Sequence, residues 1–360
     1  MRLAYVVPRY GAEVVGGAEM AVRMLVERVA SSLDWSVEVL TTCARDSRTW
    51  ANEYASGTSV ENGVTVHRFA ATGRDPGFDA FSGHVLLGPT PSWSDQQEWM
   101  QMQGPVSDEL LDAAASSEAD LGVFSPYLYD PIVRGVPRVG GRAVVHPAAH
   151  DEPALALPIL APVFTDAAGF VFYTHGERRL VERRFAVGHT PSLVLGLGVE
   201  PPASPPDPAA LGIDEPYLLC VGRVDESKGT GLLAQAFAAY KARRPGPLKL
   251  VFAGQVVDRP VEHPDVVVAG PVPEDVKWGG YAGAVGLVQP SPYESFSLVL
   301  IEGWLAGAPA LVNAACLATR EHVSRSGGGL TFGSYAEFEV AVDRLLGDPG
   351  LRGRLAEAGR

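Results

Sequence analysis

Short apolar segments alternate with helix-like segments along almost the whole chain, and this alternation limits the possible folds more than any other feature. Within most of these apolar segments, apolar and polar residues do not alternate, which is typical of parallel strands that are buried on both faces. Strands are expected near residues 2–7, 37–41, 64–69, 121–124, 142–146, 168–173 and 192–195, and again near 217–221, 248–253, 266–269, 285–289 and 309–312. Repeated strand–helix units form parallel sheets. The sequence therefore predicts an α/β protein with two such sheets.

A proline-rich stretch, Glu200–Pro208, separates the two halves of this pattern. Proline lacks a backbone N–H, so such a stretch cannot continue a helix or a central strand, and it is typical of a semi-rigid connector. A chain of 360 residues is long enough for two domain cores. We therefore expect an N-terminal Rossmann-like domain over residues 1–199, a linker over 200–216 and a C-terminal Rossmann-like domain over 217–360.

The composition is that of a large enzyme. A formal net charge of −13 disfavours nucleic acid as a partner and strong adsorption to anionic membranes. No apolar run approaches the ~20 residues that a membrane span needs, and Arg2–Val7 has the pattern of a first strand rather than of a signal peptide. The three cysteines, Cys43, Cys220 and Cys316, lack metal-ligand spacing and are expected to be reduced, buried thiols. These features predict a cytoplasmic protein.

Two carboxylates, Glu294 and Glu302, stand on either side of a predicted strand-to-helix junction. Glu294 lies in the loop after a buried strand, and Glu302 lies about a turn and a half inside a helix that begins near Ser297. Unpaired N–H groups at a helix N-terminus attract anions. The two carboxylates can therefore flank a ligand that has hydroxyls at both ends and phosphates between them, as a nucleotide sugar does. Taken alone, the spacing also fits two charges on a helix surface.

A second motif, Gly222–Gly229, follows the predicted strand Tyr217–Val221. Ligands of open parallel sheets bind outside the carboxyl ends of the strands, where this segment lies. Gly222 lets the backbone turn away, and the guanidinium of Arg223 together with the ammonium of Lys228 suits a pyrophosphate. The alternative is a surface loop with two solvated cations.

Together, these two segments resemble the signature of retaining glycosyltransferases of the GT-B fold, most closely glycosyltransferase family four. The resemblance implies two Rossmann-like domains that face each other across a ligand cleft. It also implies that Arg223 and Lys228 hold the donor diphosphate, that Glu294 contacts the donor sugar and that Glu302 hydrogen-bonds the ribose. Gly222 would belong to the same donor site.

Two N-terminal segments extend the resemblance. Gly16 and Gly17 follow the first predicted strand, as in the family's glycine-rich loop near donor and acceptor, and glycine there permits close backbone approach. His150 precedes Asp151 after another strand, a pair that in the family reaches the donor sugar, and it matches better than His146. A histidine there could hydrogen-bond a sugar hydroxyl or relay a proton. A capping or surface role for His150 stays open.

Other positions carry weaker predictions. Val272 lies in a segment that resembles the family loop around the nucleobase. The stretch from Ala71 to Pro105 is rich in Gly, Pro, Ser and aromatic residues, and it is interpreted as a long loop that shapes the acceptor pocket. Acceptor contacts are expected from Trp93, Trp99 and Tyr127; a packed surface excursion is the alternative.

The chain departs from the family at Ser295, Phe296 and Ser297, where many members have Gly-Phe-Gly. Serine still offers backbone N–H groups and can cap a helix, but its Cβ narrows the space near the phosphates. No Asp-x-Asp motif stands where a divalent cation would bridge a diphosphate, so neither a metal nor another cofactor is expected.

The resulting hypothesis is a metal-independent retaining glycosyltransferase that uses a UDP- or GDP-linked hexose-type sugar and an acceptor that is a glycan, a lipid or a small aglycone. His150, Glu294, Arg223 and Lys228 form its predicted catalytic group. One alternative is a nucleotide-sugar 2-epimerase of the same fold. Another is a non-catalytic nucleotide-sugar-binding partner of a glycosyltransferase.

Overall fold

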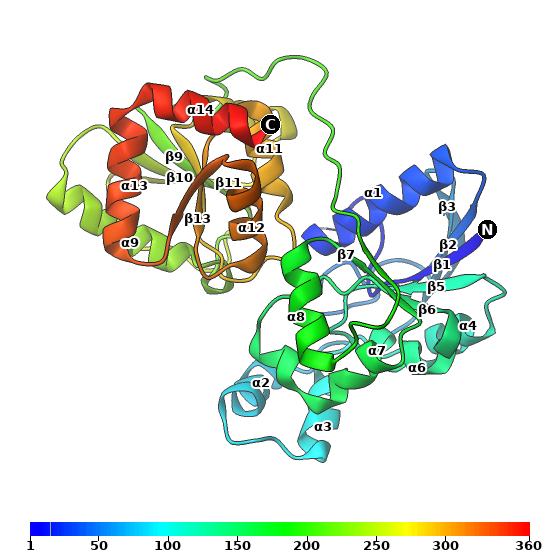
Figure 1. The fold of residues 1–360 in the computed structure, drawn as a ribbon. Helices are drawn as coiled ribbons and strands as arrows, with labels where there is room; N and C mark the ends of the chain where they lie inside the picture. Colours follow the sequence, from blue (N-terminus) through cyan, green and yellow to red (C-terminus); the bar gives the residue numbers. More distant parts are fainter. Residues whose placement is uncertain (15) are drawn as a thin grey trace. The chain divides into compact units, whose positions relative to one another are not determined.

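The computed structural model describes residues 1–14 and 16–360, which form two compact units, Met1–Leu197 and Gly198–Arg360 (Figure 1). Each unit contains one sheet flanked by helices. The α/β class and the two parallel sheets expected from the sequence are confirmed. No helix in the described ranges is both long and apolar enough to span a membrane.

The N-terminal unit is built on an eight-stranded sheet with the order β3-β4-β2-β1-β5-β6-β7-β8. Its strands are β1 (Arg2–Val6), β2 (Ser36–Thr42), β3 (Gly57–Glu61), β4 (Val64–Phe69), β5 (Leu121–Phe124), β6 (Ala143–Val145), β7 (Gly169–Phe172) and β8 (Ser192–Val194). All neighbours are parallel except β3 and β4. The prediction missed β3, because this edge strand is almost entirely exposed and carries no apolar run. Asn62 and Gly63, both with positive φ, form the turn that could have revealed the hairpin.

Helices cover both faces of this sheet. They are α1 (Gly17–Ser32), α2 (Phe78–Leu87), α3 (Trp93–Gln103), α4 (Asp108–Ser116), α5 (Asp130–Val133), α6 (Gly135–Val139), α7 (Ala161–Thr165) and α8 (His175–Phe185). Val22 and Val26 of α1 pack on alternate residues of β1, β2 and β4, while α4 and α6 lie on the other side (Figure 1).

The interpretation of residues 71–105 as a long loop was wrong, because this stretch contains α2 and α3, which pack on each other. Ser92 begins α3 with a capping box: its hydroxyl accepts from the N–H of Asp95, whose carboxylate accepts from the N–H of Ser92. The Ser-x-x-Asp pattern was therefore a helix signal within a composition otherwise typical of loops.

The C-terminal unit is built on a six-stranded parallel sheet with the order β11-β10-β9-β12-β13-β14. Its strands are β9 (Tyr217–Val221), β10 (Lys249–Ala253), β11 (Val266–Gly270), β12 (Gly286–Gln289), β13 (Ala310–Asn313) and β14 (Gly329–Phe332). The chain runs outward from β9 to β11 and then returns to β12 on the opposite side of β9. The strand order therefore reverses between β9 and β12, and such a switch point is where open α/β sheets bind ligands.

Two apolar clusters hold the helices on this second sheet. The helices are α9 (Thr230–Arg243), α10 (Glu274–Gly283), α11 (Leu298–Ala306), α12 (Leu317–Ser326), α13 (Tyr335–Gly347) and α14 (Pro349–Gly359). Phe237 of α9 and Phe338 of α13 belong to the cluster on one face, whereas Trp278 of α10 and Trp304 of α11 belong to the other. The sequence prediction missed β14, a short, half-exposed strand that begins at the last of three consecutive glycines.

Part of the expected linker packs against the C-terminal unit. Leu211 and Ile213 pack against the apolar cluster that contains α10. A side chain at Gly279 of α10 would lie 2.2 Å from the carbonyl oxygen of Asp207, so this close approach requires glycine. Residues 207–213 therefore join the C-terminal unit.

Candidate active site

The predicted donor residues lie at the carboxyl ends of β9 and β12, the two strands that flank the switch point of the C-terminal unit. The loop after β9 carries Arg223 and Lys228, and the loop after β12 carries Glu294 and leads into α11. The parallel pairing of the two strands brings the two loops to the same edge of the sheet.

Arg223 is held by the loop on which it lies. Gly222 adopts a φ of 129°, which lets the chain leave β9 sharply, as expected of a glycine there. The Arg223 guanidinium pairs with Asp225 and donates to the Ser227 hydroxyl at 3.2 Å. Burial raises the pKa of Asp225, but hydrogen bonds from Ser227, the Lys228 N–H and Arg223 outweigh it and leave this pKa below its ordinary value. Asp225, absent from the sequence prediction, thus orients Arg223.

Lys228 connects the two loops. Its Nζ lies 2.6 Å from Oε1 of Glu294, and the Glu294 side chain is only 13% exposed while that of Lys228 is 34% exposed. A charge pair this close is oriented by partial burial, unlike a fully solvated surface pair. Asn313 Nδ2 donates to the carbonyl of Pro290 at 2.8 Å and fixes the start of the second loop. The cation and the carboxylate predicted to meet at the donor site therefore lie in contact.

Glu302 is buried on α11, about a turn and a half from Ser297, which is the N-cap of that helix. Its Oε2 accepts from the Tyr281 hydroxyl at 2.7 Å, and its Oε1 lies 3.1 Å from Nζ of Lys277. Both partners come from α10. Burial raises the pKa of Tyr281 well above its ordinary value, and the adjacent Glu302 carboxylate raises it further. The sequence prediction missed Tyr281 and Lys277, because nothing in the pattern placed α10 against α11.

The Ser295–Ser297 segment shows the cost of replacing Gly-Phe-Gly. Ser297 has a φ of 78°, in the left-handed region that favours glycine. Gln289 Nε2 donates to its hydroxyl at 3.2 Å. Phe296 is buried edge-to-face against His322 of α12, with ring centroids 4.8 Å apart.

Val272, the predicted nucleobase contact, is half-buried between β11 and α10 and packs on the apolar cluster there.

In the N-terminal unit, Gly16 and Gly17 begin α1 at the carboxyl end of β1; the neighbouring Val15 lies outside the described residues. Glu19 in the first turn of α1 forms a buried ion pair with Arg9, whose Nη1 also donates to the Arg45 carbonyl at 2.8 Å. A side chain on Gly16 would collide with the Glu19 carboxylate. Glycine at this position therefore makes room for the ion pair.

His150 lies in the segment after β6, also at the carboxyl edge of its sheet. Its Nδ1 is 3.0 Å from Oε1 of Glu152, and the same oxygen accepts from the Tyr127 hydroxyl at 2.6 Å. Burial raises the pKa of Glu152, but His150 and Tyr127 outweigh it and leave this pKa below its ordinary value. Tyr127, predicted to contact the acceptor, is buried and orients Glu152. A direct acceptor contact from its side chain stays a prediction.

The other histidine of this region has a structural environment. His146 directly follows β6, is buried and packs against Tyr173, with ring centroids 4.1 Å apart and the ring planes tilted by 44°. Burial lowers the pKa of His146 to about 3, so the ring is neutral. His146 is therefore a core residue, and the sugar-contacting role of His150 stays a prediction.

The two tryptophans predicted near the acceptor differ in exposure. Trp93 at the start of α3 is 54% exposed, whereas Trp99 is buried and donates from its indole N–H to Ser82 Oγ at 2.9 Å. Trp99 thus packs α3 against α2. An acceptor contact from either ring stays a prediction.

The cysteines Cys43, Cys220 and Cys316 are buried free thiols, as expected, and burial raises the pKa of Cys220 to about 12.

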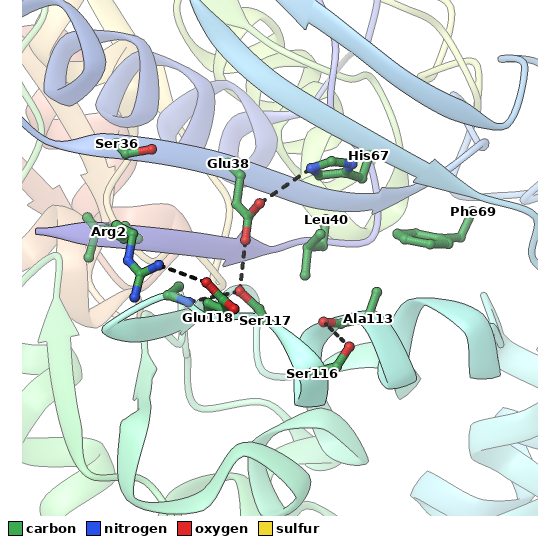
Figure 2. Close-up of a pocket in the computed structure, with 12 residues that line it drawn as sticks. Arg2, Ser36, Glu38, Leu40, His67, Phe69, Ala113, Ser116, Ser117 and Glu118 are labelled. Carbon is green, nitrogen blue, oxygen red and sulfur yellow. Dashed lines mark hydrogen bonds and ion pairs between the residues drawn. The ribbon is translucent and has the colours of Figure 1, made fainter.

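A hollow of about 420 Å³ in the N-terminal unit lies away from these residues (Figure 2). Arg2 and Ser36 line it at the amino ends of β1 and β2. Three further lining residues interact with one another: the Ser117 hydroxyl donates to the Glu38 carboxylate at 2.8 Å, and the other Glu38 oxygen lies 3.4 Å from Nε2 of His67. The predicted site residues follow the opposite, carboxyl ends of the strands. The hollow is therefore separate from the candidate site.

Residues 215–348 match the family described as Glycosyl transferases group 1. This range contains the motif with Arg223 and Lys228 and both Glu294 and Glu302. The C-terminal unit is a group 1 glycosyl transferase domain. A D-inositol 3-phosphate glycosyltransferase from Frankia alni is 32% identical to the chain, over 42% of this chain and 43% of the relative. The chain thus spans less than half the length of this relative in the match.

Solved structures extend the likeness beyond the group 1 domain. Sucrose-phosphate synthase from Thermosynechococcus elongatus superposes with a TM-score of 0.69 at 18% identity. The match covers 99% of this chain and 92% of the synthase chain. An Anabaena protein solved in complex with UDP and glucose superposes with a TM-score of 0.66 at 15% identity. The match covers 100% of this chain and 93% of the Anabaena chain. At these identities the likeness concerns the fold, which is GT-B. The resemblance stated from the motifs is confirmed.

Proposed function

We propose that this chain is a metal-independent retaining glycosyltransferase that moves a hexose-type sugar from a UDP- or GDP-linked donor to an acceptor hydroxyl. The contact between Lys228 and Glu294, next to the oriented Arg223 at the switch point of the sheet, is the observation that carries this proposal. Two cations and a carboxylate at one strand edge match a ligand in which a diphosphate adjoins a sugar.

The residues divide the reaction between them. The bond between the anomeric carbon and the diphosphate oxygen breaks, and the electron pair leaves with the diphosphate. Arg223, Lys228 and the N-terminus of α11 stabilise that charge, supplying what a divalent cation would otherwise provide. The acceptor oxygen bonds to the anomeric carbon on the face that the diphosphate leaves. The acceptor proton passes to the departing phosphate oxygen.

The remaining residues orient the substrates. Glu294 accepts from hydroxyls of the donor sugar, and Glu302, held by Tyr281 and Lys277, accepts from the ribose. His150, held by Glu152, donates to a sugar hydroxyl. Binding energy directed at these non-reacting groups places the anomeric carbon next to the acceptor.

The names of the related proteins favour a phosphorylated polyol or hexose as acceptor. The matched relative is a D-inositol 3-phosphate glycosyltransferase and a solved structure of the same fold is a sucrose-phosphate synthase. The acceptor panel to test first therefore contains inositol 3-phosphate, glucose 6-phosphate and fructose 6-phosphate. Lipid and glycan acceptors form the second panel.

The test is a transfer assay with UDP- and GDP-linked hexoses against both panels, with the product detected by mass spectrometry and its anomeric configuration by NMR. Wild-type protein should form one glycoside with the donor's anomeric configuration. Glu294→Gln should lower turnover by about 10²-fold or more, because it removes charge and orientation at the reacting sugar. Glu215→Gln, a matched change at the amino end of β9, should leave turnover unchanged.

Three other results would each contradict the proposal. Inversion at the anomeric carbon would exclude the retaining step. Isomerisation of the donor sugar without an acceptor would favour the 2-epimerase. Donor binding without turnover across both panels would favour a non-catalytic nucleotide-sugar-binding partner.

A further inference from the structure

A carboxylate buried in the N-terminal unit is bound by backbone N–H groups. Glu177 of α8 is 2% exposed. Its Oε1 accepts from the N–H of Ala149, and its Oε2 accepts from the N–H of Tyr173, both at 2.7 Å. Burial raises the pKa of Glu177 to about 8, and backbone hydrogen bonds from Tyr173, Ala149, Thr174 and Ala148 oppose this rise.

The segment that Glu177 binds has a strained backbone. Ala148 has a φ of 54°, in the left-handed region that a residue with a Cβ rarely adopts. The consecutive N–H groups of Ala148 and Ala149 both interact with the Glu177 side chain, an arrangement similar to an anion-binding nest. On the other side, the Pro147 carbonyl accepts from the N–H of Tyr127 at 3.0 Å. The segment is therefore fixed by Glu177 and by the chain after β5.

The residue that follows this clamp is His150. Fixing the backbone of Ala149 sets the direction in which the His150 side chain leaves the chain. His150 Nδ1 then meets Glu152 at 3.0 Å, and Glu152 is itself held by Tyr127 at 2.6 Å. Glu177 touches neither His150 nor Glu152 in these contacts, so it acts on them through the backbone.

We propose that Glu177 is a positioning residue: its carboxylate holds the Pro147–Asp151 segment in the strained conformation that aims His150 at the donor sugar. The proposal rests on the proposed glycosyl transfer for its kinetic consequence, but not for the conformation of the segment. Glu177 lies in the first turn of a helix capped by Thr174, a common place for an acidic residue, and its contact with the Ala149 N–H was not predicted from the sequence.

The test uses Glu177→Gln in the full chain, with two controls on the same helix. Glutamine keeps the shape of the side chain but places an N–H₂ group against one of two backbone donors. Glu182→Gln makes the same chemical change at a residue that pairs with Arg178. Val181→Ala removes buried apolar volume from α8, and so lowers stability without removing a hydrogen bond to the segment.

Amide hydrogen exchange measures the segment directly. Glu177→Gln should raise the exchange rate over residues 148–151 by about 10-fold or more, while Glu182→Gln and Val181→Ala leave it unchanged. In the transfer assay, Glu177→Gln should lower kcat by about 10²-fold, with the donor KM changed less than about threefold, since the reacting geometry and not the donor grip is lost. Val181→Ala, measured below its melting temperature, should keep both constants.

Unchanged exchange in Glu177→Gln would overturn the proposal. Equal loss of kcat in Val181→Ala would also overturn it, because general destabilisation would then explain the effect. A wild-type protein that transfers sugar from no donor refutes the proposed function instead, and the exchange measurement still decides whether Glu177 holds the segment.

Discussion

Ser297 holds a left-handed backbone conformation at the N-cap of α11, where an L-residue is strained by about 1 kcal/mol or more relative to glycine. Ser297→Gly and Ser297→Ala both lose the hydrogen bond from Gln289, but only glycine relieves the strain. We therefore expect the glycine variant to have the larger free energy of unfolding, by about 1 kcal/mol. Urea denaturation of the two variants measures this difference.

Ser295 is the matched control, because it is not among the residues with positive φ. There glycine should be less stable than alanine, by about 0.5–1 kcal/mol, since it only adds freedom to the unfolded chain. The same order of stability at both positions would contradict the strain assigned to Ser297.

His146 should make the protein sensitive to acid. Its pKa is about 3 in the folded state and about 6.5 when exposed, so folding favours the neutral ring. The stability that this provides is complete above pH 6.5 and is lost as the pH falls from 6.5 toward 3, by at most about 1.4 kcal/mol per pH unit. His146→Phe keeps a ring against Tyr173 and removes the titration.

The measurement for His146 is the free energy of unfolding at pH 7 and pH 5 in both proteins. The wild type should lose more stability than His146→Phe between these pH values. Glu177 opposes this trend, because a raised folded pKa makes its contribution grow as the pH falls from 8 toward 4.5, but it does so equally in both proteins. Parallel losses would show that His146 is hydrated in the folded state.

Among the elements, α10 supports Glu302 of α11 through the Tyr281 hydroxyl and the Lys277 ammonium. Tyr281→Phe removes the hydrogen bond to Glu302, which should cost about 1.5–3 kcal/mol of stability because the acceptor is charged and buried. It should also weaken nucleotide binding several-fold, since Glu302 keeps only Lys277 of the two partners that orient it. Calorimetric titration with the preferred nucleoside diphosphate measures the second effect.

Tyr217→Phe provides the comparison for α10. It deletes another buried hydroxyl, which donates to the Gly280 carbonyl at 2.9 Å in the same helix. Stability should fall, by about 1 kcal/mol, while nucleotide affinity stays at the wild-type value. If both variants bind nucleotide equally well, Glu302 does not depend on Tyr281 for its role.

At the same scale, the sequence predicted the buried strands well because each is a short apolar run, as in β9 and β12. It missed β3 and β14, because an edge strand with exposed side chains needs no such run. Helices α2 and α3 were hidden by a composition rich in Gly and Pro.

At the scale of the whole molecule, the charged site residues could be predicted because the chemistry of a diphosphate and a sugar demands them in a recognisable order. Their supports could not. Tyr281 and Glu177 act through contacts between segments that are far apart in the sequence, and no local spacing encodes such contacts. Asp225 lies only two residues from Arg223, but the sequence does not show that the two side chains pair. Orientation of a site is thus a property of packing, while its chemistry is visible in the sequence.

A thermal-shift panel with UDP, GDP, ADP and TDP is the first test of whether the C-terminal unit binds a nucleotide sugar through Arg223. Each nucleotide is measured alone and linked to its common sugars. A ligand at 100 times its Kd adds about 2.7 kcal/mol of stability, enough to move Tm visibly. The control variant is Arg354→Ala, an exposed residue of α14.

We expect that one nucleotide raises the Tm of the wild type and of Arg354→Ala, and that Arg223→Ala melts cooperatively without this shift. An equal shift in Arg223→Ala would contradict the assignment of the diphosphate site. A cooperative melt that no nucleotide moves would contradict the nucleotide-sugar account as a whole.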